Sequence, residues 1–247
     1  MNLDGLLVVI PARYASTRFP GKALAELGGR TVIDRCYSQV LQVFPRAQIV
    51  VATDDDRIAD VCRGLSMDVE MTSDACLTGT DRVAEVARRR SAEWYVNVQG
   101  DEPFLDPDAL RTLVRSLADQ KSDVAVVNAY SPITIEEDFR SVTVPKVVTD
   151  RSGRLLYMSR GAIPTTKALE FRGAKRQIGM YAFRGDALAR FAAQGTKTPL
   201  EQLEDIEILR FVELGMTVHM IEVPSVGIAI DTPDDLERAR NYLASLR

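Results

Sequence analysis

The amino-acid sequence predicts an α/β fold built on a mostly parallel sheet with helices on both faces, and two observations support this. Short apolar runs rich in β-branched residues recur along the first half of the chain, at residues 6–10, 48–53, 68–72, 94–99 and 124–130. The segments between the first four runs carry apolar residues at helical spacing, as at Val32, Ile33, Cys36, Val40 and Leu41. Strands that alternate with helices favour a mostly parallel sheet.

After about residue 140 the pattern changes. Residues 145–159 contain two extended runs joined by a Ser-Gly turn, and residues 176–184 indicate another strand, so we expect a small antiparallel sub-lobe. One long helix is expected over 199–214, ended by Gly215, and the last helix has Pro233 in its first turn. No internal repeat or low-complexity linker interrupts the 247 residues, which predicts one continuous domain.

Composition excludes several classes of function. The formal net charge of −4 argues against a general nucleic-acid partner, and no apolar run is long enough for a membrane span. The absence of a secretory signal pattern predicts a cytoplasmic protein. Three widely spaced cysteines (Cys36, Cys62 and Cys76) fit reduced, mostly buried thiols, and the single histidine, His219, lies in a segment predicted to be a strand. Histidine triads and histidine metal clusters are therefore poor explanations of the chemistry.

A cationic loop follows the first predicted strand. Arg13, Arg18 and Lys22 lie beyond residues 6–10, and ligands of open α/β sheets collect at the carboxyl ends of the strands. Three cations there suggest a polyanion such as a phosphate chain. The loop is neither a Walker loop nor a dinucleotide fingerprint, and by spacing alone a solvated basic loop is an equally good interpretation.

Two acidic positions favour the phosphate interpretation. Asp101 directly follows the run at 94–99, and Asp231 lies between an apolar run and the proline-started helix. An aspartate before a helix is by itself more often a cap. Two carboxylates near a phosphate-binding loop, however, match the ligands that Mg²⁺ prefers beside a nucleoside triphosphate. We therefore predict that Asp101 and Asp231 hold Mg²⁺.

Eight ordered sequence blocks, spread over nearly the whole chain, resemble the CMP-KDO synthetase family, where KDO is 3-deoxy-manno-octulosonate. The blocks are "VVIPARYASTRFPGKAL", "VATDD", "TGTDRVAEV", "VNVQGDEP", "SRGAIP", "IGMYAFR", "PLEQLE" and "IDTPDDLERAR". The resemblance implies a Rossmann-like, nucleotide-diphospho-sugar-transferase-like fold and a homodimer. It also implies CMP transfer from CTP to KDO or a related ulosonic acid, with release of pyrophosphate and no protein nucleophile.

The resemblance assigns a role to each part of the chain. Residues 1–135 would bind CTP, 136–225 would form the acceptor and dimerisation lobe, and 226–247 would carry a metal ligand and the last helix. The catalytic residues would be Arg13, Lys22, Asp101 and Asp231. CTP would be bound by Pro11, Ala12, Arg13, Arg18, Lys22, Ala52, Thr53, Asp54, Thr78, Gly79, Thr80, Arg82 and Gln99. The small anionic acceptor would be bound by Gln99, Arg160, Arg176, Gln177, Tyr181 and Glu207.

The chain departs from the family on the acceptor side. Gln177 and Cys76 replace histidines, Ile208 replaces a glutamine, and the connection after Pro164 is shorter and lacks a Trp-Asp-Arg cluster. Ile208 is also consistent with an ordinary core residue. The departures nevertheless suggest a changed acceptor, and an alternative to KDO is a phosphonate such as phosphonoformate. A phosphonate would be served by a basic set comprising Arg160, Lys167, Arg172, Lys175 and Arg176.

Two other classes of function fit less well. A nucleotide-binding regulator without chemistry would be expected to lose a metal carboxylate, and both candidates are present. A Rossmann dehydrogenase would need a glycine fingerprint after the first strand, which this chain lacks.

Overall fold

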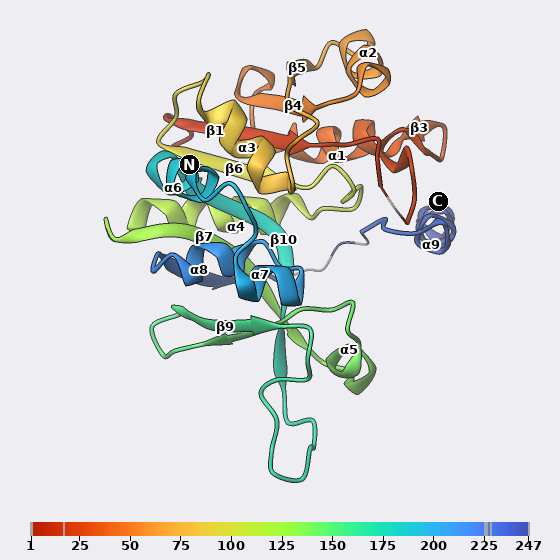
Figure 1. The fold of residues 1–247 in the computed structure, drawn as a ribbon. Coiled ribbons are helices and arrows are strands. Elements are labelled where there is room, and N and C mark those ends of the chain that lie inside the picture. Colours follow the sequence, from red (N-terminus) through yellow and green to blue (C-terminus); the bar gives the residue numbers. More distant parts are fainter. Residues whose placement is uncertain (1, 17, 225–226, 228, 247) are drawn as a thin grey trace.

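The computed structural model describes residues 2–16, 18–224, 227 and 229–246. Its central sheet runs in the order β11-β7-β10-β6-β1-β4-β5 (Figure 1). These strands are β1 (Leu6–Pro11), β4 (Ile49–Thr53), β5 (Asp68–Met71), β6 (Trp94–Val98), β7 (Val124–Ile133), β10 (Ala174–Arg184) and β11 (Thr217–Glu222). The pairs β6-β1, β1-β4, β4-β5 and β11-β7 are parallel, which confirms a mostly parallel sheet.

Helices cover both faces of this sheet. The helices of the described residues are α1 (Val32–Val40), α2 (Asp56–Gly64), α3 (Gly79–Ala87), α4 (Pro107–Ser116), α5 (Glu136–Arg140), α6 (Gly185–Ala193), α7 (Pro199–Glu204), α8 (Ile208–Glu213) and α9 (Pro233–Ser245). Short 3₁₀ turns are η1 (Lys22–Leu24), η2 (Arg46–Gln48) and η3 (Leu117–Asp119), and short strands are β2 (Glu26–Leu27) and β3 (Arg30–Thr31). No described helix has the length and apolar character needed to cross a membrane.

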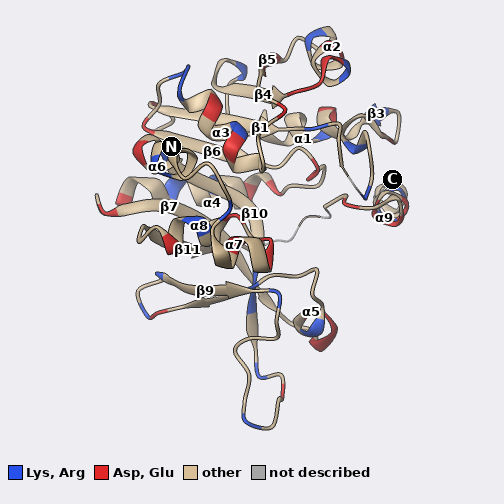
Figure 2. Ribbon diagram, in the orientation of Figure 1, with Lys and Arg blue, Asp and Glu red and all other residues tan. Residues whose placement is uncertain are grey.

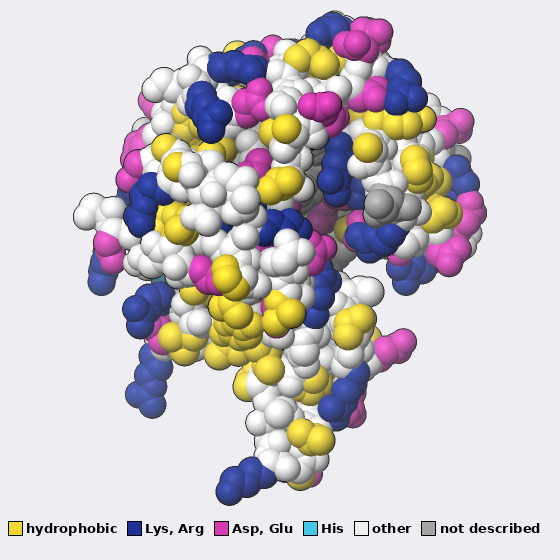
Figure 3. Space-filling view, viewed as in Figure 1, with side chains coloured by type: hydrophobic (Ala, Val, Ile, Leu, Met, Phe, Trp, Pro, Cys, Tyr) yellow, Lys and Arg dark blue, Asp and Glu magenta, His cyan; other side chains and the backbone are white. Residues whose placement is uncertain are grey.

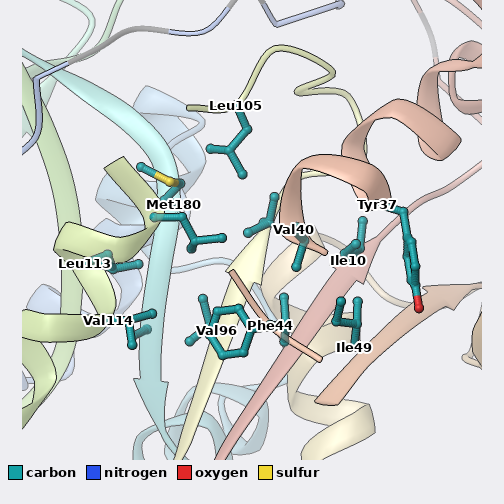
Figure 4. Packing of buried hydrophobic residues seen from close by; sticks show 14 of the residues in the cluster. Ile10, Tyr37, Val40, Phe44, Ile49, Val96, Leu105, Leu113, Val114 and Met180 are labelled. Carbon is teal, nitrogen blue, oxygen red and sulfur yellow. The ribbon is translucent and has the colours of Figure 1, made fainter. Parts of the chain in front are cut away.

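Two hydrophobic cores lie on opposite faces of the sheet because successive strand residues point in opposite directions. Val8 joins the core formed with α1, α2 and α4, part of which Figure 4 shows around Ile10, Val40 and Val96. Val9 joins the other core, which is formed with α3, α6 and α8. The continuous apolar run of β1 therefore results from burial on both faces.

The strand β10 corrects one expectation. We expected residues 176–184 in the antiparallel sub-lobe, but Met180 to Arg184 pair with β6 in the middle of the main sheet. Only the beginning of β10 reaches the lobe, where Arg176 pairs with Lys146. One strand thus belongs to both parts of the molecule and connects them.

The lobe itself is smaller than residues 136–225. It contains α5 and the antiparallel pair β8 (Lys146–Thr149) and β9 (Leu155–Ser159), with a small core of Ile133, Phe139 and Val144 (Figure 1). The later elements α6, α8 and β11 pack in the main body. The expected division at residue 225 therefore does not follow the packing.

The predicted helix over 199–214 is two helices. Asp205 has φ +50°, in the left-handed region, and separates α7 from α8. Gly215, with φ +71°, ends α8 as expected. Apolar spacing continues across the break and so cannot reveal it.

The segment before Asp231 is also not the strand that its apolar residues suggest. Ala229 and Ile230 lie outside any strand, while Ser225, Val226 and Ile228 are outside the described residues. Ile230 packs with α1 and α9, and its backbone N–H donates to the carbonyl of Asp101 at 2.9 Å. Asp101 and Ile230 are far apart in the sequence, and their hydrogen bond brings the two predicted acidic positions, Asp101 and Asp231, close together.

Two predictions about single residue types agree with the structure. The thiols of Cys36, Cys62 and Cys76 are free, the first two being buried. His219 lies in β11, as its sequence context indicates. Lys, Arg, Asp and Glu positions are mixed along the ribbon (Figure 2), as expected for the small net charge.

Candidate active site

A cavity of about 680 Å³ lies between the carboxyl ends of β1 and β6, the start of α3 and the lobe. Basic side chains gather around a hollow on the face shown in Figure 3. Fourteen of the predicted site residues line the cavity: Pro11, Ala12, Arg13, Arg18, Lys22, Thr78, Gly79, Arg82, Gln99, Asp101, Arg160, Gln177, Glu207 and Asp231. The structure thus brings most of the predicted CTP and metal residues to one place.

Six predicted residues do not line the cavity: Ala52, Thr53, Asp54, Thr80, Arg176 and Tyr181. Ala52 and Thr53 are buried in β4. Asp54 forms an ion pair with Arg82, whose Nη1 donates to Thr72 Oγ1 at 2.7 Å. Asp54 therefore acts on the cavity through Arg82, which it orients.

Lys22 connects the two predicted metal carboxylates. Its Nζ donates to Asp101 Oδ2 and, at 3.0 Å, to Asp231 Oδ1, which also lies 3.1 Å from Arg18 Nη2. Burial acts to lower the pKa of Lys22, but the two neighbouring carboxylates outweigh it and raise that pKa above its usual value. Lys22 is therefore firmly protonated, and its charge is placed between two anions.

The backbone around Lys22 and Asp101 is tightly constrained. Gly21 has φ +72°, and its N–H donates to the carbonyl of Tyr14 at 2.9 Å, which turns the loop back toward the sheet. A Cβ on Gly100 would lie 2.8 Å from the carbonyl oxygen of Pro11. Only glycine at position 100 lets Asp101 come so close to the end of β1.

Asp231 is not the cap of α9. That role belongs to Thr232, whose side chain accepts from the N–H of Asp235, while Asp235 Oδ2 accepts from the N–H groups of Thr232 and Asp231. This reciprocal capping box fixes the backbone at the helix start. The carboxylate of Asp231 is consequently left to face Lys22 and Arg18, and the capping interpretation of this residue is wrong.

Glu207 holds the start of α3 against the cavity. Its carboxylate accepts from the N–H of Gly79 at 3.2 Å and from the N–H of Thr80 at 2.9 Å. Burial raises the pKa of Glu207, although these donors oppose the rise. Glu207 thus satisfies backbone donors that a helix start leaves unpaired, and it ties α8 to α3.

Buried charges extend this connection. Arg210 makes two hydrogen bonds to Glu201, at 2.6 and 2.7 Å, and one to Asp81 at 3.0 Å. Arg210 and Glu201 are fully buried, and the guanidinium also stacks on Phe191 at 3.7 Å. Elements from two distant parts of the chain, α3 and α7–α8, are joined by this network.

On the acceptor side, Gln177 reaches the cavity and Tyr181 supports it. Gln177 Nε2 donates to Tyr181 Oη at 3.0 Å and to Asn128 Oδ1 at 3.1 Å. Arg160 donates from its guanidinium to the backbone carbonyls of Glu204 at 2.6 Å and Asp205 at 3.0 Å. Tyr181 and Asn128, which support Gln177, are buried, whereas the groups that hold Arg160 are backbone carbonyls; neither kind of support can be recognised from residue type.

The structure removes much of the basis for a changed acceptor. Of the departures from the family pattern, only Gln177 lines the cavity. Ile208 is 1% exposed and packs in a core, and the Cys76 thiol donates to Glu85 outside the cavity. The loop after Pro164 extends away from the main sheet (Figure 1).

The proposed basic set for a phosphonate is likewise dispersed. Arg176 forms an ion pair with Asp138 at 3.0 Å, and Lys175 lies over the ring of Tyr130. Lys167 and Arg172 are exposed, and neither lines the cavity. Only Arg160 of that set borders the cavity, so the five residues do not form one anion site.

The cavity is also lined by residues that were not predicted from the sequence. The further lining residues are Ser16, Ala23, Leu77, Gly100, Thr143, Pro145, Gly179, Lys197 and Asp205. Lys197 and Asp205 carry charge, but the break between α7 and α8 that exposes Asp205 is invisible in the apolar pattern. A polar residue with left-handed propensity inside a predicted helix was the one available signal.

The two aspartates suit magnesium as part of a larger set of ligands. Among the described residues, no group of three or more His, Cys, Asp or Glu side chains could hold a metal by itself. Mg²⁺ commonly takes one or two protein carboxylates together with substrate phosphates and water. Asp101 and Asp231, brought together on Lys22, fit that requirement.

Comparisons with known proteins agree with this geometry. The family model described as "Cytidylyltransferase" matches residues 7–218. The chain is 42% identical over 250 residues to 3-deoxy-manno-octulosonate cytidylyltransferase of Syntrophotalea carbinolica, covering 98% of this chain and 99% of the relative. It is 41% identical over 249 residues to the protein of that name from Geobacter sulfurreducens, covering 96% and 99%.

A solved structure of a protein with a similar name also resembles this chain closely. CMP:2-keto-3-deoxy-manno-octonic acid synthetase complexed with CTP superimposes with a TM-score of 0.90 at 34% identity, covering 98% of this chain and 99% of that one. A cytidylyltransferase from Leptospira borgpetersenii, at 17% identity and a TM-score of 0.65, shares the fold. This chain is therefore a nucleotidyltransferase and belongs to the 3-deoxy-manno-octulosonate cytidylyltransferase family.

Proposed function

We propose that this protein transfers CMP from CTP to KDO and releases pyrophosphate. The observation that carries the proposal is the meeting of Lys22, Asp101 and Asp231 in a cavity that also receives Arg13 and Arg18. The names of the relatives, at about 40% identity over nearly the whole chain, support KDO as the acceptor. No observation favours a phosphonate, because the basic set assigned to it is dispersed.

The reaction is a displacement at phosphorus. A hydroxyl oxygen of the acceptor forms a bond to the α-phosphorus of CTP, the bond to the pyrophosphate oxygen breaks, and the hydroxyl proton is released. Arg13, Arg18 and Lys22 would bind the triphosphate and stabilise the charge that gathers on the leaving pyrophosphate. Binding and positioning account for catalysis here, since no protein nucleophile is needed.

Asp101 and Asp231 would hold Mg²⁺ in this reaction. When bound, the ion supplies positive charge to the phosphates and lowers the pKa of the acceptor hydroxyl. Lys22 keeps the two carboxylates together in the free protein. When CTP binds, its ammonium would turn to phosphate oxygens. The same side chain would thus serve both states.

The nucleoside would lie against the start of α3 and the end of β1. A Cβ at Gly79 would lie 3.2 Å from Gln99 Oε1, so glycine at this position lets the Gln99 amide pack against the start of α3, where both residues line the cavity. Arg82 would contact the nucleoside in an orientation set by Asp54. Ala52 and Thr53 would support this wall from inside the sheet.

We also propose that the protein forms a homodimer through the lobe. Large hydrophobic side chains are exposed there, among them Ile135, Val142, Leu156 and Leu169. Exposed apolar groups gathered on one part of a protein mark interaction surfaces. Sedimentation would show twice the mass of one 27.3 kDa chain if this is correct, and the mass of a single chain if it is not.

The acceptor is tested by measuring pyrophosphate release with CTP and Mg²⁺. KDO, its 8-amino analogue, a sialic acid and several phosphonates would be compared at equal concentrations, with Asp101→Asn as the inactive control. We expect release with KDO far above that with the other acceptors. Release only with phosphonates would contradict the proposal, and would show that the acceptor half of the cavity serves another substrate.

A further inference from the structure

An ion pair at the edge of the cavity has no part in the assignments above. Lys197 Nζ lies 2.6 Å from Asp205 Oδ1, and both residues line the same cavity as the predicted CTP residues. The side chain of Lys197 is 23% exposed, whereas that of Asp205 is 73% exposed. The Lys197 ammonium is therefore held in place by its surroundings. The Asp205 carboxylate is open to solvent, so water or a ligand can take its place beside Lys197.

The backbone next to Lys197 is firmly anchored. Thr198 is the N-cap of α7, and its N–H donates to Glu201 Oε2 at 3.1 Å. Glu213 binds the Thr198 hydroxyl and accepts from the N–H of Leu200 at 3.0 Å. Lys197 thus projects from a rigid point, which is the condition for precise recognition of a ligand.

The backbone of Asp205 is fixed by its place at the end of α7. Asp205 is the C-cap of α7 with φ +50°, the left-handed conformation in which helices commonly end and which aspartate tolerates better than most residues. Its N–H donates to the carbonyl of Glu201 at 2.8 Å, and its own carbonyl accepts from Arg160 Nη2 at 3.0 Å. The break between α7 and α8 is what turns Asp205 toward Lys197.

The ion pair between Lys197 and Asp205 contributes little to the stability of the fold, so stability does not explain why the two residues are placed together. A salt bridge with one partner so exposed contributes little to folding free energy, because solvent screens it and two flexible side chains must be ordered. The pKa of Asp205 is nevertheless held below its usual value, first by the hydrogen bond from Lys197 and further by the charges of Arg160 and Arg13. Three basic residues lining the cavity therefore favour an anion at the position of this carboxylate.

We propose that Lys197 binds the carboxylate of the acceptor, and that Asp205 occupies Lys197 until the acceptor displaces it. The inference rests on the proposed function, in which the acceptor is an acid. When an acidic acceptor binds, its carboxylate takes the place of the Asp205 carboxylate, and the Lys197 ammonium stays paired with an anion. A neutral sugar would have to leave Lys197 bound to Asp205 or unpaired, so the pair selects anionic acceptors.

The test compares Lys197→Met, Asp205→Asn and the double variant with wild type, using Lys121→Met as a matched control. Lys121 is an exposed lysine that does not line the cavity. Asparagine tolerates the left-handed conformation, so Asp205→Asn keeps the backbone while removing the competing charge. Steady-state pyrophosphate release gives kcat and the KM values for KDO and CTP, and thermal melting checks that each variant is folded.

We expect Lys197→Met to raise the KM for KDO by about 10- to 100-fold, as for loss of a charge-assisted hydrogen bond, with the KM for CTP within about twofold of wild type. Asp205→Asn should lower the KM for KDO, and this gain should vanish in the double variant because it acts through Lys197. Lys121→Met should match wild type. Wild type should also prefer KDO over the same sugar with its carboxylate reduced to an alcohol, and Lys197→Met should lose most of this preference.

The two possible failures can be told apart. If wild type is active with KDO but Lys197→Met keeps its KM for KDO, or raises both KM values equally, the assignment of Lys197 is wrong and the proposed function stands. A higher KM for KDO in Asp205→Asn would likewise overturn the competition. If wild type releases no pyrophosphate with KDO, the proposed function fails and this assignment fails with it.

Discussion

The buried ion pair between Arg210 and Glu201 allows a quantitative prediction about stability. In Arg210→Met, the Glu201 carboxylate would stay fully buried, keeping the N–H of Thr198 but losing both bonds from the guanidinium. Breaking a buried pair from one side costs about 3–5 kcal/mol, because an uncompensated charge is left in a medium of low dielectric constant. The contacts to Asp81 and to the Phe191 ring are lost as well.

Thermal and urea unfolding would measure this loss. For a chain of this size, about 2–4 °C is lost per kcal/mol, so the midpoint should fall by about 6–20 °C. The double variant Glu201→Gln/Arg210→Met removes both charges and should recover a large part of the loss. A loss below about 1 kcal/mol in Arg210→Met, or a double variant less stable than the single one, would refute the reasoning.

Three further predictions concern the cavity and its supports. Asp101→Asn should lower kcat for pyrophosphate release by at least about a hundredfold, since an amide binds Mg²⁺ poorly, while the melting temperature stays near that of wild type; wild-type activity would remove Asp101 from the metal site. Gly100→Ala should weaken CTP binding and stability together, because its Cβ meets the Pro11 carbonyl at 2.8 Å, and calorimetric titration with CTP would show this. Asp235→Ala should cost about 0.5–2 kcal/mol near pH 7. The pKa of Asp235 in the folded protein is lowered because the hydrogen bonds from Thr232 and Arg238 outweigh burial, so this contribution is present above the unfolded pKa of about 3.9 and is lost as the pH falls through the folded value. If the difference in unfolding free energy between wild type and Asp235→Ala grew as the pH was lowered, this assignment would be contradicted.

Local patterns were sufficient for most of the secondary structure. The β-branched runs that became β1, β4 and β6 are buried on both faces, and burial is what makes a strand continuously apolar. The same patterns failed at Asp205 and in the segment before Asp231. In both places hydrogen bonds to other parts of the chain set the backbone, and apolar spacing does not record such bonds.

Some residues of the candidate site could be predicted from the sequence, and others could not. Arg13, Lys22 and Asp101 could be grouped from the sequence because each follows a strand, and the carboxyl ends of neighbouring parallel strands share one edge of a sheet. Arg176 was expected at the acceptor but lies against Asp138, and Tyr181 lies behind Gln177. Neither side chain lines the cavity, because contacts made in the folded chain, and not residue type, decide which way a side chain points.

The sequence by itself determined the α/β class, the order of the strands along the chain and the family, because these depend on periodicity and on motifs within short segments. Only the tertiary structure decided which charges meet. Lys22 with Asp231, Arg210 with Asp81 and Arg160 with the Asp205 carbonyl each join segments far apart in the chain. An ion pair or hydrogen bond depends on separations of a few ångströms, and folding sets those separations only when the sheet, the helices and the lobe are packed together.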